Sequence, residues 1–221
     1  IKFYKMVSPL LYIFEKLGVS RMKIIDNIEA LEDLYAKPLS SPLKKVQSVL
    51  TSNYQLWVEK SRFVVLTTVG PEGTDASPRG DKGSVVTVEN DQTLLLPDWR
   101  GNNRLDSLRN IVRDGRVSLM FMVPGCLNVV RVNGNAVLSA DSALLRRFEN
   151  ANKTPKTVIV ITVGEVYFQC AKAMMRSELW SGQDQSFGLP TAGDFIHEFT
   201  EGFDAKTYDD GYGAYAKHRL W

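Results

Sequence analysis

Three short segments of the chain are more polar than the apolar runs around them and could do chemistry. The first covers residues 77–83 (SPRGDKG), where Arg79 and Lys82 stand among glycines. Side-chain cations and backbone N–H groups arranged in this way can bind a phosphate. The glycine and lysine spacing of a P-loop is absent. A solvated turn between strands is the alternative interpretation of this segment.

The second polar segment, residues 97–104 (PDWRGNNR), follows a predicted strand and leads into a helix that we expect to begin near Asn102. The start of a helix presents free N–H groups and a partial positive charge, which favour an anion. Arg100 and Arg104 can each donate two parallel hydrogen bonds to such an anion. An Asn-capped helix with exposed arginines is the alternative. The Asn-Asn-Arg run directly after a strand favours a phosphate site.

The third segment, residues 170–180 (CAKAMMRSELW), follows the last long predicted strand. Lys172 and Arg176 share a face if the segment is helical, and Trp180 could stack on a planar ring or close the core. Cys170 has no nearby His, so we expect it to be a buried small hydrophobe rather than a nucleophile. The role of this segment stays open between ligand contact and packing.

Other forms of side-chain chemistry have no recognisable pattern in the sequence. His197 and His218 are the two histidines, and both lie in the tail, so no Ser-His-Asp arrangement can be proposed. Two cysteines cannot build a disulfide framework, and neither a zinc-ligand spacing nor a Gly-x-Gly-x-x-Gly fingerprint occurs. If the protein is an enzyme, a bound cofactor carries the reaction and the chain supplies orientation and phosphate binding.

The elements that must position these segments are mainly short strands. Runs of β-branched and aromatic residues are separated by tight turns such as Asn133-Gly134, which favours an antiparallel barrel or sandwich over a parallel sheet. The predicted strands cover residues 63–69, 85–88, 94–96, 117–123, 129–138 and 158–168. The predicted helices cover residues 26–35, 41–60 with a break at Asn53, 104–113, a stretch starting near Asp141, and two tail segments at 195–199 and 205–217.

Composition excludes several classes of protein and names none. The 221 residues carry 27 Lys and Arg against 25 Asp and Glu, and this net charge of +2 gives no reason to expect a nucleic-acid partner. No apolar run approaches the roughly 20 residues that a membrane-spanning helix needs. Residues 1–23 hold five of the basic residues and one Glu, so the rest of the chain is slightly acidic.

The basic start of the chain is interpreted as an extension, residues 1–21, ahead of a single domain at 22–221. A targeting peptide is the alternative, because a short apolar stretch follows the first basic residues. Within the domain we expect a helical lead-in at about 22–60, a barrel core at about 62–180 and a helical tail at about 191–221.

The polar segments at 77–81, 97–110 and 170–180, together with RVSLMF at 116–121 and RVNG at 131–134, resemble the pyridoxamine 5'-phosphate oxidase-like flavoprotein family. The resemblance covers roughly Met22 to the C-terminus and is closest to an uncharacterised FMN-dependent branch. It implies an α+β fold, in which flanking helices surround an antiparallel split β-barrel. It also implies a homodimer that holds FMN in a groove at the subunit interface.

The resemblance assigns roles to individual residues as well. Arg79 and Arg104 take the places of cations that hold the FMN phosphate. Lys172, Arg176 and Trp180 are candidates for the groove wall. The full set implied to contact the cofactor is Arg79, Pro97, Asp98, Arg100, Asn102, Asn103, Arg104, Lys172, Arg176 and Trp180.

Two departures from the oxidase itself limit what the resemblance implies. The oxidase's Gln near the flavin corresponds to about Val129 here, and its pyridoxal phosphate-binding segment has no counterpart. We therefore expect a cytoplasmic FMN-dependent oxidoreductase that acts on an unidentified small molecule, with no nucleic-acid, membrane or metal partner. A non-catalytic flavin- or haem-binding protein on the same barrel is the alternative, and a structural domain without cofactor is a third.

Overall fold

The computed structural model describes residues 23–36, 45–217 and 219, and the chain divides into two compact units, Ile1–Leu43 and Lys44–Trp221. The described part of the first unit holds helix α2 (Ile28–Glu32), which Asn27 caps by accepting the Ala30 N–H at 2.8 Å. This helix is shorter than the predicted 26–35. None of its residues is buried, so it lacks the tertiary packing that would stabilise a longer helix. The expected extension at 1–21 lies outside the described residues.

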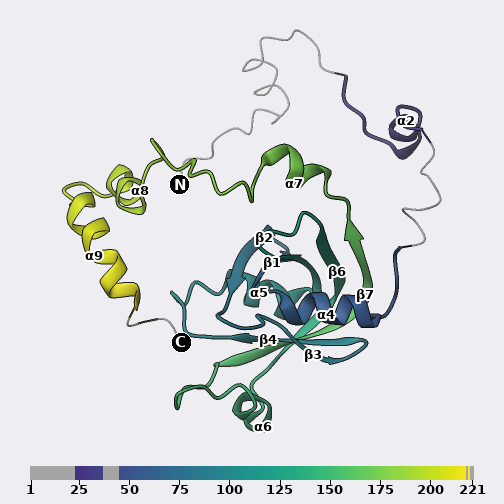
Figure 1. Ribbon diagram of the computed structural model, residues 1–221, viewed down its shortest axis with the longest axis horizontal. Coiled ribbons are helices and arrows are strands. Elements are labelled where there is room, and N and C mark those ends of the chain that lie inside the picture. The colour runs from purple at the N-terminus through teal and green to yellow at the C-terminus, as the bar shows by residue number, and fades with distance from the viewer. Residues whose placement is uncertain (1–22, 37–44, 218, 220–221) are drawn as a thin grey trace, which may run out of the picture. The chain divides into compact units, whose positions relative to one another are not determined.

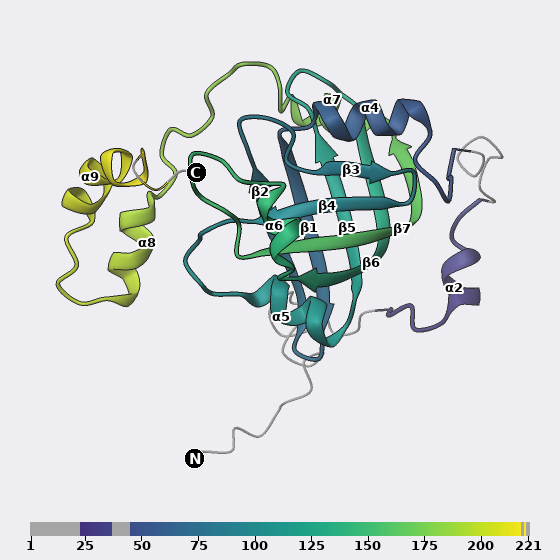
Figure 2. The same cartoon turned by 90° about the horizontal axis from the view of Figure 1, so that it is seen from below.

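The second unit is built on a seven-stranded antiparallel sheet that curls into a split barrel (Figures 1 and 2). The order of the strands in the sheet is β2-β1-β5-β6-β7-β4-β3. The predicted α+β fold with an antiparallel split barrel is therefore confirmed. The strands are β1 (Phe63–Gly70), β2 (Gly73–Gly80), β3 (Thr87–Asn90), β4 (Thr93–Asp98), β5 (Arg116–Met122), β6 (Val129–Ser139) and β7 (Thr157–Gln169).

The core of the barrel forms because alternate side chains of each strand point inward. On β1, Val64 and Leu66 are fully buried and lie directly opposite Phe121 and Leu119 of β5. The same arrangement recurs between β4 and β7, where Leu96 faces Ile159. Burying a side chain of this size contributes about 1.5–3 kcal/mol.

The prediction of a helix at 41–60 is wrong, because the helix that forms is shorter. Helix α4 runs from Ser52 to Lys60 and buries Val58 against the barrel. The backbone of Gln47 is instead held extended, because its N–H and C=O both bond to Val166 of β7, at 2.9 and 2.7 Å. The expected cap at Ser41 lies outside the described residues.

The remaining helices follow the prediction more closely. Asp141 caps α6 (Ser142–Arg146) by accepting two backbone N–H groups at 2.9 Å. The two tail helices are present as α8 (Ala192–Phe199) and α9 (Ala205–Lys217). The described residues also form α5 (Asp106–Arg113), between β4 and β5, and α7 (Lys172–Ser177), after β7.

The first polar segment belongs to a strand, which corrects the prediction of a loop between strands. Residues 77–80 form the end of β2, where Arg79 lies opposite Val64 and Pro78 opposite Val65. The segment lacks β-branched and apolar residues because β2 is an edge strand with mostly exposed side chains. Proline is tolerated at an edge, since one side of the strand needs no hydrogen-bonded neighbour.

We expect the turn between α5 and β5 to stabilise the fold in a pH-dependent way. The Arg116 side chain and backbone N–H both donate to Asp114, and these bonds lower the pKa of Asp114 from 3.8 to about 2. A carboxyl with a lowered pKa in the folded state stabilises above its ordinary pKa, and the contribution is lost as the pH falls toward 2. Asp114→Asn should therefore lower the melting temperature at pH 6 and leave it nearly unchanged at pH 2.

Differential scanning calorimetry of both proteins across this range measures the effect. Asp91→Asn is the matched control, because the described residues give the Asp91 side chain no ion pair. An equal loss of stability at pH 6 and pH 2 in D114N would show that the carboxylate charge is not the cause.

Candidate functional site

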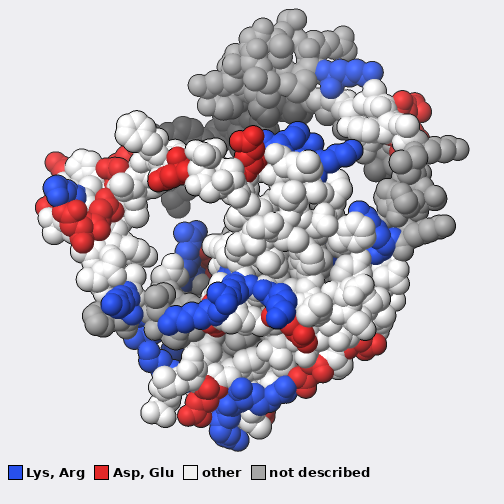
Figure 3. Space-filling model, in the orientation of Figure 1, with Lys and Arg blue, Asp and Glu red and all other residues white. Residues whose placement is uncertain are grey.

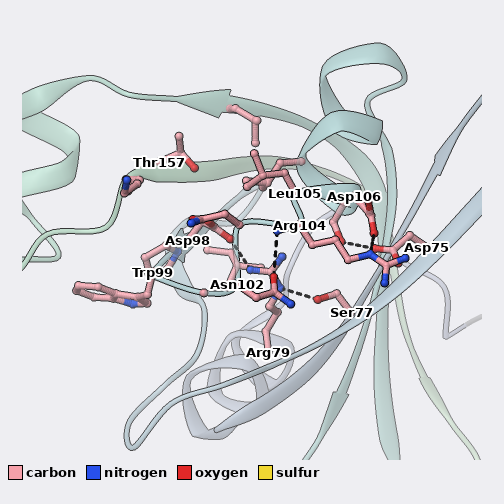
Figure 4. Close-up of a pocket in the computed structure, with 18 of the residues that line it drawn as sticks. Asp75, Ser77, Arg79, Asp98, Trp99, Asn102, Arg104, Leu105, Asp106 and Thr157 are labelled. Carbon is pink, nitrogen blue, oxygen red and sulfur yellow. Dashed lines mark hydrogen bonds and ion pairs between the residues drawn. The ribbon is translucent and has the colours of Figure 1, made fainter. Parts of the chain in front are cut away.

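A cleft of about 1010 Å³ brings the first two polar segments together (Figure 4). Its lining comes from residues 75–81 on β2 and just after it, from residues 96–109 between β4 and α5, and from Lys156 and Thr157 at the start of β7. Strands β2 and β4 are not neighbours in the sheet. The cleft therefore exists only because the sheet curls and brings its two ends together.

An ion pair between Arg79 and Asp98 spans the two ends of the sheet. Nη1 of Arg79 lies 2.5 Å from Oδ1 of Asp98, and Nε donates to Oγ of Ser77 at 3.1 Å. The Arg79 and Asp98 side chains are only 21% and 15% exposed. Arg79 thus enters the cleft from β2 already oriented, and an anion bound there would share it with Asp98.

The loop around Arg104 has an unusual backbone. Asn103 and Leu105 both adopt the left-handed conformation, with φ angles of 61° and 63°. Asparagine adopts this conformation readily, whereas it costs a residue such as Leu105 about 1–2 kcal/mol. Oδ1 of Asn102 accepts the Arg104 N–H at 3.0 Å. The Arg104 guanidinium forms an ion pair with Asp106, and 80% of the Arg104 side chain is exposed. Such strained loops often occur at functional sites.

This loop corrects the predicted start of the helix. Helix α5 begins at Asp106 rather than near Asn102, and its N-cap residue Leu105 makes no side-chain capping bond. Left-handed residues cannot belong to a right-handed helix, so the segment up to Leu105 lies outside α5. Arg104 therefore lies on the loop ahead of the helix.

Polar side chains that the sequence reasoning missed fasten α5 to the barrel. Oγ of Ser107 donates to Asp75 on β2 at 2.5 Å. Nδ2 of Asn110 donates to Oγ1 of Thr68 on β1 at 3.1 Å, and both residues are buried. A Cβ added to Gly70 would lie 2.2 Å from Oδ1 of Asn110. Ser107 and Asn110 are three positions apart and so share one face of α5. Polar residues at this spacing on the face that packs against the barrel are the sequence signal for such contacts.

The cleft is rich in cations. Asp98 and Asp106 neutralise Arg79 and Arg104, and Arg113 lies 3.1 Å from Glu72. In the described part of the chain, Arg100, Arg109 and Lys156 have no ion-pair partner. These cations favour an anionic ligand at the cleft. Figure 3 shows how Lys and Arg side chains are distributed over one face of the molecule. The cations that line the cleft are Arg79, Arg100, Arg104, Arg109, Arg113 and Lys156.

An apolar wall lies beside the cations. Leu105 and Val112 are 45% and 74% exposed, although both are hydrophobic. Such a surface beside charged groups suits a ligand with an apolar ring and an anionic end. Among the described residues, no His, Cys, Met or Tyr lines the cleft. The valine and leucine residues that line the cleft are Val85, Leu96, Leu105, Leu108, Val112 and Leu138, and Ala76, Pro78, Pro97 and Trp99 line it as well.

The third polar segment does not reach the cleft of its own chain. Lys172 and Arg176 lie on α7, and neither they nor Trp180 belong to the described lining. Nε1 of Trp180 donates to the carbonyl of Cys126 at 2.9 Å, which ties it to the turn between β5 and β6. Cys170 is exposed, so the expectation of a buried cysteine is wrong. It directly follows the end of β7, beyond the packed part of the sheet.

Two kinds of feature are absent from the described residues. No group of three or more His, Cys, Asp or Glu side chains in them could hold a metal ion. Within the same residues, no helix has both the length and the apolar character that crossing a membrane requires.

The sheet and its cleft define the class of protein as a split barrel with a cleft lined by several cations. The chain belongs to the pyridoxamine 5'-phosphate oxidase family, because the sequence model described as pyridoxamine 5'-phosphate oxidase matches residues 50–170. This match covers more than half of the chain and confirms the resemblance. No curated protein matches the chain.

Several solved structures are similar to this chain at low sequence identity. HupZ from Group A Streptococcus is 17% identical, with a TM-score of 0.44 over 52% of this chain and 90% of its own. General Stress Protein 26 from Bacillus anthracis is 18% identical, with a TM-score of 0.41 over 51% and 88%. An FMN-binding protein from Syntrophomonas wolfei is 16% identical, with a TM-score of 0.39 over 73% and 97%.

Proposed function

We propose that the cleft binds FMN and that the protein is an FMN-dependent oxidoreductase acting on a small molecule. The observation that carries the proposal is the meeting of Arg79, Asp98 and the Arg104 loop in one cleft across the split of the barrel. Membership of the pyridoxamine 5'-phosphate oxidase family supports it.

The residues and the size of the cleft fit FMN in four respects. The phosphate needs cations, which Arg79, Arg100 and Arg104 offer. The flavin ring needs an apolar wall, which α5 and its neighbours offer. The cleft also contains a buried hydroxyl, Oγ1 of Thr157, without a hydrogen-bond partner in the described structure. Its volume of about 1010 Å³ lies just above the range of about 300–1,000 Å³ that is common for ligand sites.

Bound FMN would supply the atom that accepts hydride and would pass the electrons on. The chain's own residues would bind and orient the cofactor: Arg79 and Arg104 at the phosphate, and the apolar wall along the ring, where it excludes water. Because no described histidine lines the cleft, we assign no side chain to proton transfer.

We further propose a homodimer with FMN at the subunit interface. Lys172, Arg176 and Trp180 lie away from the cleft of their own chain, so they could contact the cofactor only as residues of the partner subunit. The nature of the small molecule and a cytoplasmic location stay predictions.

A flavin is favoured over haem by one observation. Haem iron in proteins is held by a side chain such as His, Cys, Met or Tyr, and none of these types is present in the described lining of the cleft. A non-catalytic flavin-binding protein stays the second candidate, because the same cleft would serve binding without turnover.

We expect the purified protein to bind FMN and to quench its fluorescence, with flavin absorption bands that stay with the protein through gel filtration. A colourless protein that does not bind added FMN would contradict the proposal. A Soret band after addition of haem would favour haem as the ligand. Bleaching of bound flavin by a nicotinamide donor, followed by reoxidation in air, separates an enzyme from a binder. Analytical ultracentrifugation tests the homodimer, for which we expect a mass twice that of the chain.

A further inference from the structure

The two helices near the C-terminus form a hairpin that the proposed function does not use. Helices α8 and α9 lie side by side (Figures 1 and 2). The carboxylate of Asp209 on α9 accepts from the Gly193 N–H at 3.0 Å and from the Thr191 hydroxyl at 2.5 Å, at the start of α8. Nδ1 of His197 also lies 2.8 Å from the Phe203 carbonyl. These bonds hold the two helices together, so the tail hairpin (residues 191–217) presents a defined surface.

Large aromatic side chains lie on the outside of the tail hairpin. Phe195 and Phe199 on α8 are 53% and 84% exposed, and Tyr212 and Tyr215 on α9 are 49% and 54% exposed. Helices as short as α8 and α9 depend on tertiary packing for their stability. Exposed apolar side chains that are grouped in this way mark a surface that contacts another molecule or subunit.

The charge of the tail indicates what kind of surface it contacts. Residues 184–217 carry seven Asp and Glu against two Lys. A second hairpin of the same charge would be repelled, whereas a surface that combines cations with apolar groups would be attracted. The cleft is such a surface: Arg109 and Lys156 have no ion-pair partner among the described residues, and Leu105 and Val112 are exposed.

The exposed faces of α8 and α5 are complementary. On α8, Glu198 stands three positions after the first exposed phenylalanine and directly before the second, so all three share one side of the helix. On α5, Arg109 stands three positions before Val112 and shares a face with it. Neither Glu198 nor Arg109 has an ion-pair partner in the described part of the chain. Each face therefore combines exposed apolar groups with one unpaired charge, and the two charges have opposite signs.

We propose that the tail hairpin of one subunit covers the cleft of the partner subunit. This proposal rests on the proposed function, since it adds residues of the partner to the flavin site and to the homodimer. With α5 along one face of the flavin ring, Phe195 and Phe199 cover the opposite face and exclude water. Glu198 pairs with Arg109 of the partner subunit beyond the edge of the ring.

Two observations favour the partner's cleft over the cleft of the same chain. No residue of the tail hairpin belongs to the described lining of its own cleft. The hydrogen bonds and the ion pair that the structure describes for residues 184–217 all join residues within the tail. The hairpin also follows residues 172–180, which we have already placed at the cleft of the partner subunit.

Photochemical cross-linking of the full chain tests the contact. A chain with p-benzoylphenylalanine at position 199 is mixed with a wild-type chain labelled with ¹⁵N, and the mixture is irradiated with FMN bound. Mass spectrometry should find position 199 of the unlabelled chain linked to residues 96–113 of the labelled chain. The same reagent at Leu56, which is equally exposed on α4, is the control and should give no link to residues 96–113.

Charge reversal tests the pairing of Glu198 with Arg109. Arg109→Glu and Glu198→Arg should each speed the release of bound FMN about tenfold, and the double variant R109E/E198R should release FMN nearly as slowly as the wild type. Phe199→Ala should also speed release about tenfold, the effect of losing a contact worth 1.4 kcal/mol. Arg146→Glu is the matched control, because Arg146 is exposed on α6 and has no described ion pair.

The other outcomes contradict separate claims. Cross-links that stay within the unlabelled chain, or that join position 199 to another surface, would overturn the proposal and leave the FMN site standing. Failure of the double variant to restore slow release would overturn the pairing of Glu198 with Arg109. A monomeric wild-type protein would contradict the homodimer, and one that does not bind FMN would contradict the proposed function itself.

Discussion

Arg104→Ala is expected to weaken FMN binding by about 1.5–3 kcal/mol, the range for a hydrogen bond to a charged group. This corresponds to an increase of about ten- to hundredfold in the dissociation constant. The Arg104 side chain is 80% exposed, and its ion-pair partner in the described structure is Asp106. The substitution should therefore leave the free energy of unfolding nearly unchanged, because exposed ion pairs contribute little.

Fluorescence titration of FMN at constant salt measures this effect. Arg116→Ala is the matched control, because Arg116 is paired with Asp114 and does not line the cleft. Asp106→Asn tests whether the Arg104 guanidinium binds the phosphate. Because this substitution releases Arg104 from its carboxylate partner, it should tighten FMN binding. If R104A binds FMN normally, the phosphate lies elsewhere, and the unpaired Arg100, Arg109 and Lys156 become the candidates.

Asn110→Ala is expected to lower the free energy of unfolding by about 1–3 kcal/mol. The substitution removes the partner of the Thr68 hydroxyl, which is 1% exposed and cannot bond to solvent instead. A buried polar group without a partner costs this amount. Chemical denaturation followed by circular dichroism measures the loss. FMN affinity should fall as well, because α5 carries the Arg104 loop at its start and Asn110 fixes α5 on β1.

A second substitution at the same contact provides a stringent check. Gly70→Ala would place a Cβ 2.2 Å from Oδ1 of Asn110 and displace that side chain. It should destabilise the wild type but have little effect in the N110A background, where no side chain is in the way. Gly83→Ala is the matched control, since nothing lies within 4 Å of the added Cβ. Additive effects of G70A and N110A would contradict the contact.

The strands of the barrel could be predicted because their signal is local. A run such as residues 63–70 alternates between the core and the outside, and β-branched residues dominate it. Strand β2 escaped the prediction because its side chains are mostly exposed at a sheet edge, so Ser77 and Arg79 carry no apolar pattern. The helix at 41–60 was extended too far because backbone pairing of Gln47 with Val166 depends on a residue more than a hundred positions away.

By itself, the sequence determined the class of fold, the family and the two polar segments that line the cleft, because these depend on residue types and their spacing along the chain. The tertiary structure decided which side chains meet. Curling of the sheet joins Arg79 to Asp98, and packing of α5 on the barrel joins Ser107 to Asp75. Pairing of β4 with β7 places Thr157 opposite Asp98, and the 170–180 segment lies away from the cleft. These contacts depend on strand order and closure of the sheet, which link residues far apart in the chain. No local pattern encodes them.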